Sequence, residues 1–178
     1  MAKLFEDYNK YREEELQAIR LVVFDFDGVF TDNAVYTNQS GEEMVKCCRS
    51  DGIGLKLLQK AGVSILVISG ETNSVVVKRC EKLGINLIQS TTKLKDLNSY
   101  LRNMNLTLDN PIRRNEICYV GNDTPDLPCM QSVGFPIAVR DAHIGLIPIA
   151  KYVTWLGGGD GAVREVCDLI CESKQGDV

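Results

Sequence analysis

Short apolar runs recur along the chain, and segments with helical spacing separate them. Each run is continuous rather than alternating, which is typical of strands buried on both faces of a parallel sheet. Strands that alternate with helices predict an α/β fold with a Rossmann-like, doubly wound parallel sheet. The runs cover residues 21–24, 63–68, 85–88, 117–120, 136–139 and 152–155.

Residues that favour helix ends place a helix after most of these runs. The pattern predicts helices over residues 52–61, 74–83, 93–104 and 161–172, and another from Pro125 to a stop at Gly134. A further amphipathic helix is expected over residues 3–19, before the first strand. The predicted caps are Asp51, Asn73, Thr92, Thr124 and Asp160, with Gly62 and Gly84 as stops.

One segment departs from this alternation. Residues 34–47 hold two short β-type stretches around Asn-Gln-Ser-Gly, which predicts a β-hairpin flap projecting from the sheet. The chain shows no internal repeat or linker, so we expect a single domain over residues 1–178, with an N-terminal helix within residues 1–20.

Composition narrows the class of protein. The chain has 178 residues, 44% of them hydrophobic, and a net charge of −4, which argues against a nucleic-acid partner. It has no apolar run of about 18 residues and no signal-peptide core, so we expect no membrane span and a cytoplasmic location. The seven cysteines form no Cys-x-x-Cys pair and the only histidine is His143, which favours reduced cysteines over a zinc site.

Polar residues follow several of the predicted strands, at the edge where ligands bind in open α/β sheets. Two carboxylates two residues apart after a buried strand suit phosphoryl transfer: one can attack phosphorus, and the other can protonate the departing alcohol. Carboxylates gathered in one place repel one another and a phosphate, so binding a phosphate there requires a hard cation such as Mg²⁺. The ammonium of Lys93 and the hydroxyl of Ser69 add hydrogen-bond donors for the phosphoryl oxygens. The residues are Asp25, Asp27, Ser69, Gly70, Glu71, Lys93, Asn122, Asp123 and Asp126.

Each piece alone also has a structural explanation. An Asp pair before a glycine, a Ser-Gly pair and a Gly-Asn-Asp segment all occur as ordinary turns or caps, and Lys93 could be a solvated residue of a first helical turn. Their occurrence in order, each at a strand end, favours the catalytic interpretation.

These segments resemble the four motifs of the haloacid dehalogenase superfamily. Residues 25–29 read Asp-Phe-Asp-Gly-Val, followed by Thr31 and Asp32, like the first motif. Ser69, Lys93 and the segment Gly-Asn-Asp-Thr-Pro-Asp at residues 121–126 stand where the other three belong. The resemblance covers nearly the whole chain, and the short hairpin in place of a cap domain implies the capless branch.

The resemblance implies a role for each residue. Asp25 would form an aspartyl-phosphate, Asp27 would be the general acid and base, and Ser69 and Lys93 would complete the catalytic set. Mg²⁺ would be held by the Asp25 carboxylate, the Asp27 main-chain carbonyl, and either Asn122 or Asp123. The family more often has Gly-Asp-Asp where this chain has Gly-Asn-Asp, so Asn122 supplies an amide in place of a charge. Asp126 would orient Lys93 or the metal's surroundings, with Thr31 in support.

The capless branch includes phosphatases of 3-deoxy-D-manno-octulosonate (KDO) 8-phosphate and of N-acylneuraminate or KDN 9-phosphate. The tail at residues 158–169 and the Asp-Ala-His at residues 141–143 resemble both groups. The resemblance implies a sugar-acid phosphate as the substrate, bound by Gly70, Glu71, Lys82 and Arg164.

Single residues bear on which sugar acid is bound. Glu71 stands where the octulosonate enzymes usually have an arginine, and Asp160 also stands where those enzymes tend to have an arginine. Together with Lys82, these two departures favour a nine-carbon acid. The N-terminal segment and residues 163–169 favour the octulosonate group. Lys82 could instead complement a helix C-terminus, and Arg164 could bind a sugar carboxylate or form a structural ion pair.

A site without a cap lies open to water, and members of this branch commonly cover it by forming tetramers. We therefore expect a homotetramer with residues 34–47 in the interface. Two alternatives are a weak or non-catalytic tetramerising module, like that fused to acylneuraminate cytidylyltransferases, and a phospho-accepting receiver domain. Receiver domains carry their acceptor on a later strand, and the Asp-x-Asp pair with Ser69 does not fit them.

Overall fold

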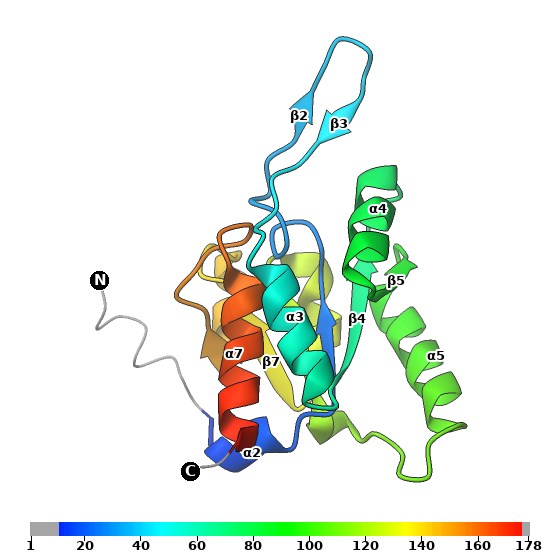
Figure 1. Cartoon of the computed structure of the whole chain (residues 1–178), viewed down its shortest axis with the longest axis vertical. Helices are drawn as coiled ribbons and strands as arrows, with labels where there is room; N and C mark the ends of the chain where they lie inside the picture. The colour runs from blue at the N-terminus through cyan, green and yellow to red at the C-terminus, as the bar shows by residue number, and fades with distance from the viewer. Residues whose placement is uncertain (1–10, 176–178) are drawn as a thin grey trace.

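The computed structural model describes residues 11–175, which form an open, twisted sheet with helices on both faces (Figure 1). Six strands lie in the order β5-β4-β1-β6-β7-β8, and every neighbouring pair is parallel. This topology confirms the predicted doubly wound α/β fold. The strands are β1 (Leu21–Phe24), β4 (Ser64–Ser69), β5 (Asn86–Gln89), β6 (Ile117–Gly121), β7 (Phe135–Ala138) and β8 (Tyr152–Val153).

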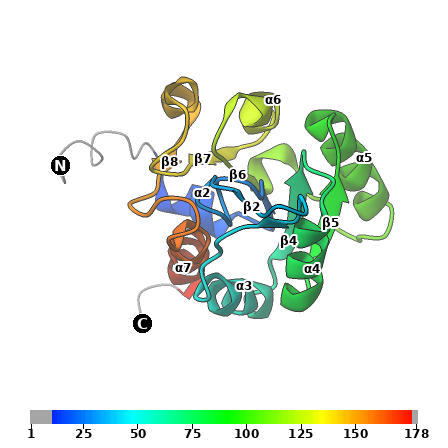
Figure 2. The ribbon, with the colours of Figure 1, turned by 90° about the horizontal axis from the view of Figure 1, so that it is seen from above.

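The helices divide between the two faces of the sheet, as the view from above shows (Figure 2). One apolar cluster joins one face of the sheet to α3, α4 and α7, and a second cluster joins the other face to α5 and α6. The helices are α2 (Glu13–Gln17), α3 (Asp51–Lys60), α4 (Ser74–Leu83), α5 (Lys93–Asn105), α6 (Leu127–Gln131) and α7 (Ala162–Gln175), with 3₁₀ turns η1 (Arg114–Glu116), η2 (Thr124–Asp126) and η3 (Ile144–Ile149).

Strand β1 shows why its apolar run is continuous. Val22 and Phe24 belong to one cluster and Leu21 and Val23 to the other, and all four side chains are buried. Each such side chain contributes about 1.5–3 kcal/mol to folding relative to an exposed one. Because β1 sits between β4 and β6, the residue that follows it is held at the centre of the sheet edge.

The predicted hairpin projects beyond the sheet as β2 (Tyr36–Thr37) and β3 (Glu43–Met44), an antiparallel pair (Figure 1). Its base is joined by a bridge between Thr31 and Cys47. Val35, Tyr36 and Met44 are 56%, 56% and 62% exposed, so the hairpin carries apolar side chains that this chain does not cover.

Some predicted helix ends are correct and others are wrong. Asn73 caps α4 by accepting from the Val76 N–H, and α4 ends at Gly84 in the left-handed conformation, as predicted. Asp51, however, is not a cap: Ser50 holds that position and Asp51 is the first residue of α3. Likewise Asp123, and not Thr124, caps the turn at Thr124–Asp126.

The predicted N-terminal helix is tested only in part. Residues 1–10 lie outside the described residues, and α2 covers only Glu13–Gln17 of the remainder. Of the helices in the described part of the chain, none has the length and apolar character needed to cross a membrane.

Candidate active site

Asp25 lies at the end of β1, at the carboxyl edge of the sheet. Its N–H donates to the Val120 carbonyl of β6 at 2.9 Å, which continues the strand pairing up to the catalytic candidate. The side chain is 5% exposed, and its Oδ1 accepts from the Phe26 N–H at 2.8 Å and from Lys93 Nζ at 2.7 Å. Among the described residues no donor bonds to Oδ2, so this oxygen is free to attack an incoming group.

Lys93 is held between two carboxylates. It is the first residue of α5, is 8% exposed, and its Nζ lies 2.7 Å from Asp25 Oδ1 and 2.8 Å from Asp126 Oδ1. Asp126 is fully buried and also accepts from the Tyr119 hydroxyl at 2.8 Å and the Asn122 N–H at 3.0 Å. A buried carboxylate with this many donors is fixed in place, so Asp126 orients both Lys93 and the Asn122 main chain.

The protonation of this cluster follows from burial and charge. The pKa of Asp25 is raised to about 8: burial has the largest effect, the charge of Asp126 adds to it, and Lys93 partly opposes both. For Lys93, burial alone would lower the pKa, but the carboxylates of Asp25 and Asp126 raise it above its ordinary value. Lys93 is therefore a cation at neutral pH, and Asp25 needs additional positive charge to ionise fully.

Asp27 and Ser69 lie beside this cluster. The Ser69 hydroxyl is buried, donates to Asp27 Oδ2 at 3.5 Å and accepts from the Glu71 N–H at 3.1 Å. Burial of Asp27 raises the pKa of its carboxyl, and the negative charge of Glu71 adds to that effect. A carboxyl with a raised pKa suits a proton donor to a leaving group.

The residues proposed to hold Mg²⁺ offer only oxygen ligands, as that ion prefers. They are the Asp25 carboxylate, the Asp27 main-chain carbonyl and the Asn122 amide. Asn122 packs against the first motif: a Cβ added to Gly28 would lie 1.9 Å from Asn122 Nδ2. Asp123 is exposed and its Oδ1 accepts from the Thr124 N–H, so Asn122 is the better placed of the two candidates.

Within residues 11–175 no three His, Cys, Asp or Glu side chains lie close enough together to bind a metal ion. This result is compatible with the proposed ligands, because two of the three are a main-chain carbonyl and an amide. Bound there, Mg²⁺ would supply positive charge that favours ionised Asp25 and screens its repulsion of a phosphate.

Thr31 and Gly70 also lie at this site. The Thr31 side chain is buried, and its Oγ1 accepts from the Gly28 N–H at 3.0 Å and the Asn33 N–H at 3.3 Å, which fixes the turn after Asp27. A Cβ added to Gly70 would lie 4.0 Å from Lys93 Cε. The turn after β4 therefore passes close to the Lys93 side chain.

Two predicted substrate-binding residues lie on other elements. Lys82 is an exposed residue of α4, on a pocket that α4 shares with α3. Arg164, on α7, places its Nε 2.8 Å and 2.7 Å from the two oxygens of Asp168, one helical turn later. Of the two roles considered for Arg164, the contacts support the structural ion pair.

Sequence reasoning missed Tyr119 and the role of Asp141. Tyr119 is inside an apolar run and looks like a core residue, although its hydroxyl bonds to Asp126. The one sequence feature that could have indicated this role is the position of the tyrosine, two residues before the Gly-Asn-Asp segment. Asp141 follows β7 and accepts from the Gly158 N–H at 2.9 Å, a contact between segments that no local pattern reveals.

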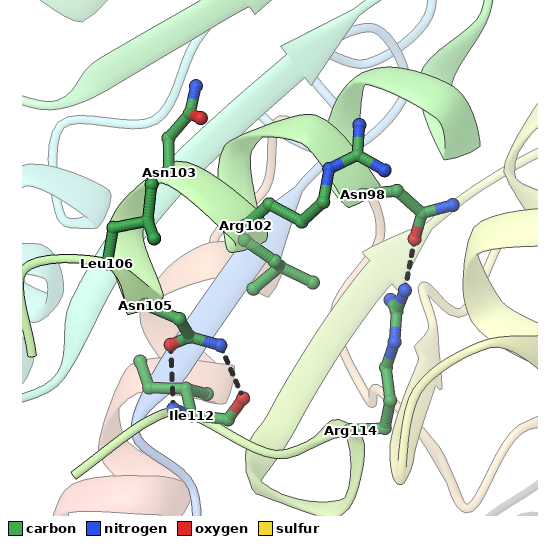
Figure 3. A pocket seen from close by; sticks show the side chains of 8 residues that line it. Asn98, Arg102, Asn103, Asn105, Leu106, Ile112 and Arg114 are labelled. Carbon is green, nitrogen blue, oxygen red and sulfur yellow. Dashed lines mark hydrogen bonds between the residues drawn. The ribbon is translucent and has the colours of Figure 1, made fainter.

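A cavity of about 800 Å³ lies elsewhere, along α5 (Figure 3). Asn105 closes one end of it, since its amide bonds to both the N–H and the carbonyl of Ile112. Arg114 donates to Asn98 across the other end. This cavity is separate from the carboxylates at the strand ends, and none of the catalytic candidates lines it.

Comparison with known proteins places the chain in a family. No family model matches it. The 3-deoxy-D-manno-octulosonate 8-phosphate phosphatase KdsC of Salmonella typhi is 40% identical over 154 residues, which are 85% of this chain and 79% of that protein. The chain belongs to the KdsC-like phosphatases of the haloacid dehalogenase superfamily. It is thus a phosphoric monoester hydrolase, as the sequence predicted.

Solved structures agree with this assignment. A putative HAD family hydrolase from Streptomyces avermitilis is 37% identical with a TM-score of 0.81, covering 91% of this chain and 88% of that one. The octulosonate phosphatase of Moraxella catarrhalis, in complex with magnesium, phosphate and KDO, is 31% identical with a TM-score of 0.84, covering 92% and 91%. The magnesium in that KdsC-like structure agrees with the predicted cofactor.

Proposed function

We propose that this KdsC-like chain is a Mg²⁺-dependent phosphatase of a 3-deoxy-2-ulosonic sugar acid, acting through an aspartyl-phosphate on Asp25. The observation that carries the proposal is the arrangement around Asp25. Its Oδ1 is held by Lys93 and the Phe26 N–H, and its Oδ2 is left for attack. A nucleophile fixed by one oxygen and open at the other suits displacement at phosphorus.

The reaction has two steps. Asp25 Oδ2 attacks phosphorus, the bond from phosphorus to the sugar oxygen breaks, and the Asp27 carboxyl gives its proton to that oxygen. The Asp27 carboxylate then takes a proton from water, whose oxygen attacks the phosphorus and releases phosphate and Asp25. Lys93 and the Ser69 hydroxyl would donate to the phosphoryl oxygens as negative charge shifts among them.

We favour a nine-carbon acid as the substrate, with KDO 8-phosphate as the competing one. Glu71 is exposed beside Ser69 and Asp27, where its carboxylate can accept from sugar hydroxyls and would repel a sugar carboxylate. The carboxylate end of the substrate therefore needs a cationic partner elsewhere.

A cationic pocket between α3 and α4 offers that partner. It has a volume of about 440 Å³, and the residues that line it include no acidic one. Within residues 11–175 none of its cations pairs with a carboxylate, and Arg79 Nε is buried without a partner. The cations are Arg49, Lys56, Arg79 and Lys82.

Substituting Lys82 is expected to affect sugar-acid substrates selectively. Lys82→Ala removes a charge from the carboxylate partner, so KM for neuraminate 9-phosphate should rise about tenfold, the size of one lost charged contact. KM for p-nitrophenyl phosphate, which has no carboxylate, should stay unchanged. Steady-state kinetics on both substrates, with the exposed Lys78→Ala on the same helix as control, tests this. An equal effect on both substrates would contradict the carboxylate role.

We further propose a homotetramer in which the hairpins, residues 34–47, and the C-terminal segments of neighbours cover each site. The exposed Val35, Tyr36 and Met44 of the hairpin support this, because they form an apolar surface that neighbouring copies would bury. We expect a tetramer by light scattering, and dissociation to smaller species in a Tyr36→Glu, Met44→Glu variant. A monomeric wild-type chain would contradict the proposal.

The function is tested by comparing kcat/KM on neuraminate 9-phosphate, KDN 9-phosphate and KDO 8-phosphate with Mg²⁺, and again after chelation. We expect activity on all three, the highest on a nine-carbon acid, and none without a divalent ion. Higher efficiency on a simple hexose phosphate would refute the sugar-acid substrate. No turnover on any phosphate would favour a non-catalytic module.

A further inference from the structure

The segment after β7 contacts both sides of the active site. Its His143 N–H donates to the Asn122 carbonyl at 2.7 Å. Two residues earlier, Asp141 Oδ1 accepts from the Gly158 N–H at 2.9 Å. The first contact reaches the residue proposed to bind the metal, and the second reaches the loop that precedes α7.

That loop is pressed against the first motif. A Cβ added to Gly158 would lie 2.0 Å from the Gly28 carbonyl oxygen and 2.6 Å from the Thr31 carbonyl oxygen, so the two backbones are in direct contact. The Gly159 N–H also donates to the Val29 carbonyl at 3.2 Å. Gly28 also packs against the Asn122 side chain, because a Cβ added to Gly28 would lie 1.9 Å from Asn122 Nδ2.

We propose that Asp141 is a positioning residue that sets the spacing between the first motif and Asn122. Through Gly158 its carboxylate holds the loop of residues 157–160 against Gly28, while the adjacent main chain holds Asn122. One three-residue segment, residues 141–143, thus contacts both the loop behind the first motif and the main chain of Asn122. This inference rests on the proposed function, since it concerns the Mg²⁺ ligands.

Mg²⁺ demands near-ideal ligand geometry, so its affinity responds to small shifts of its ligands. Residues behind metal ligands typically change metal affinity or activity by about 10–100-fold when substituted. Asp141→Ala removes the acceptor of the Gly158 N–H, and we expect about a tenfold loss of Mg²⁺ affinity. Asp141→Asn keeps an acceptor oxygen and should restore most of it.

The experiment is a calorimetric titration of the full-length chain with Mg²⁺, alongside kcat at saturating Mg²⁺. Gly158→Ala keeps the N–H that Asp141 accepts but forces the loop away from the Gly28 carbonyl, so it should weaken Mg²⁺ binding even with Asp141 present. Asp109→Ala, at an exposed aspartate far along the chain, is the control. In every soluble variant, kcat at saturating Mg²⁺ should fall by a smaller factor than the Mg²⁺ affinity does.

Equal Mg²⁺ affinity in the wild type, Asp141→Ala and Gly158→Ala would overturn the inference while leaving the proposed function intact. So would a loss in Asp141→Ala that Asp141→Asn does not restore. If Asp141→Ala does not fold, Gly158→Ala decides: a Mg²⁺ affinity equal to that of the wild type would show that this loop does not set the ligand spacing, and would overturn the inference. A wild-type chain that binds no Mg²⁺ would overturn the metal site, and this inference with it.

Discussion

The Asp25→Asn variant is expected to lose turnover by about 10⁴-fold or more, because an amide cannot form the aspartyl-phosphate. Its fold should be retained, since the amide oxygen can still accept from the Phe26 N–H and Lys93. Burial raises the pKa of Asp25 to about 8, so the ionised form is disfavoured in the folded chain. Replacing it with a neutral group should therefore leave the melting temperature unchanged or raise it.

Two measurements test this. Turnover of p-nitrophenyl phosphate gives the loss, and mass spectrometry of acid-quenched enzyme should detect phosphate on wild-type Asp25 but not on the variant. Asp109→Asn, at an exposed position outside the site, should behave like the wild type in both. A variant that keeps turnover within about tenfold would contradict the role of Asp25 as nucleophile.

The sequence alone is enough to predict the sheet and the residues at its edge. In a parallel sheet each strand is buried on both faces, so its apolar run is continuous and the polar residue that ends it is easily recognised. Asp25, Ser69 and Asn122 each stand at such a point, and the structure brings them to one edge. The hairpin was predictable too, because local turn chemistry specifies it.

Contacts between distant segments could not be predicted in this way. Asp51 was expected to cap a helix, but it lies buried at the start of α3, where its Oδ1 accepts from the Arg164 N–H at 3.3 Å. Burial raises its pKa to about 6. The Tyr119 hydroxyl and the Asp141 carboxylate are also placed by packing between elements far apart in sequence, which a local pattern does not encode.

Substituting Lys93 is expected to cost both activity and stability. Lys93→Met keeps the length of the side chain but leaves Asp25 and Asp126 facing each other without their shared cation. Removing one partner of a buried ion pair typically costs about 3–5 kcal/mol, and we expect a loss of this size at pH 8. Turnover should fall to near background, because the proposed donor to the phosphoryl group is lost as well.

The pH dependence of this loss separates electrostatics from packing. Lys93 opposes the rise in the pKa of Asp25, so without it the folded-state pKa of Asp25 lies further above that of the unfolded chain. Stability then falls as pH rises toward that folded-state pKa and is regained as pH drops. The deficit of Lys93→Met in chemical denaturation should therefore shrink toward pH 5. Lys95→Met, at an exposed position in the same helix, should show no such trend.

A second substitution in the Lys93→Met variant, Asp126→Asn, should restore much of the stability at pH 8 but none of the turnover, since it removes the repulsion without replacing the donor. A deficit that does not change with pH would instead indicate that Lys93 stabilises the fold by packing alone.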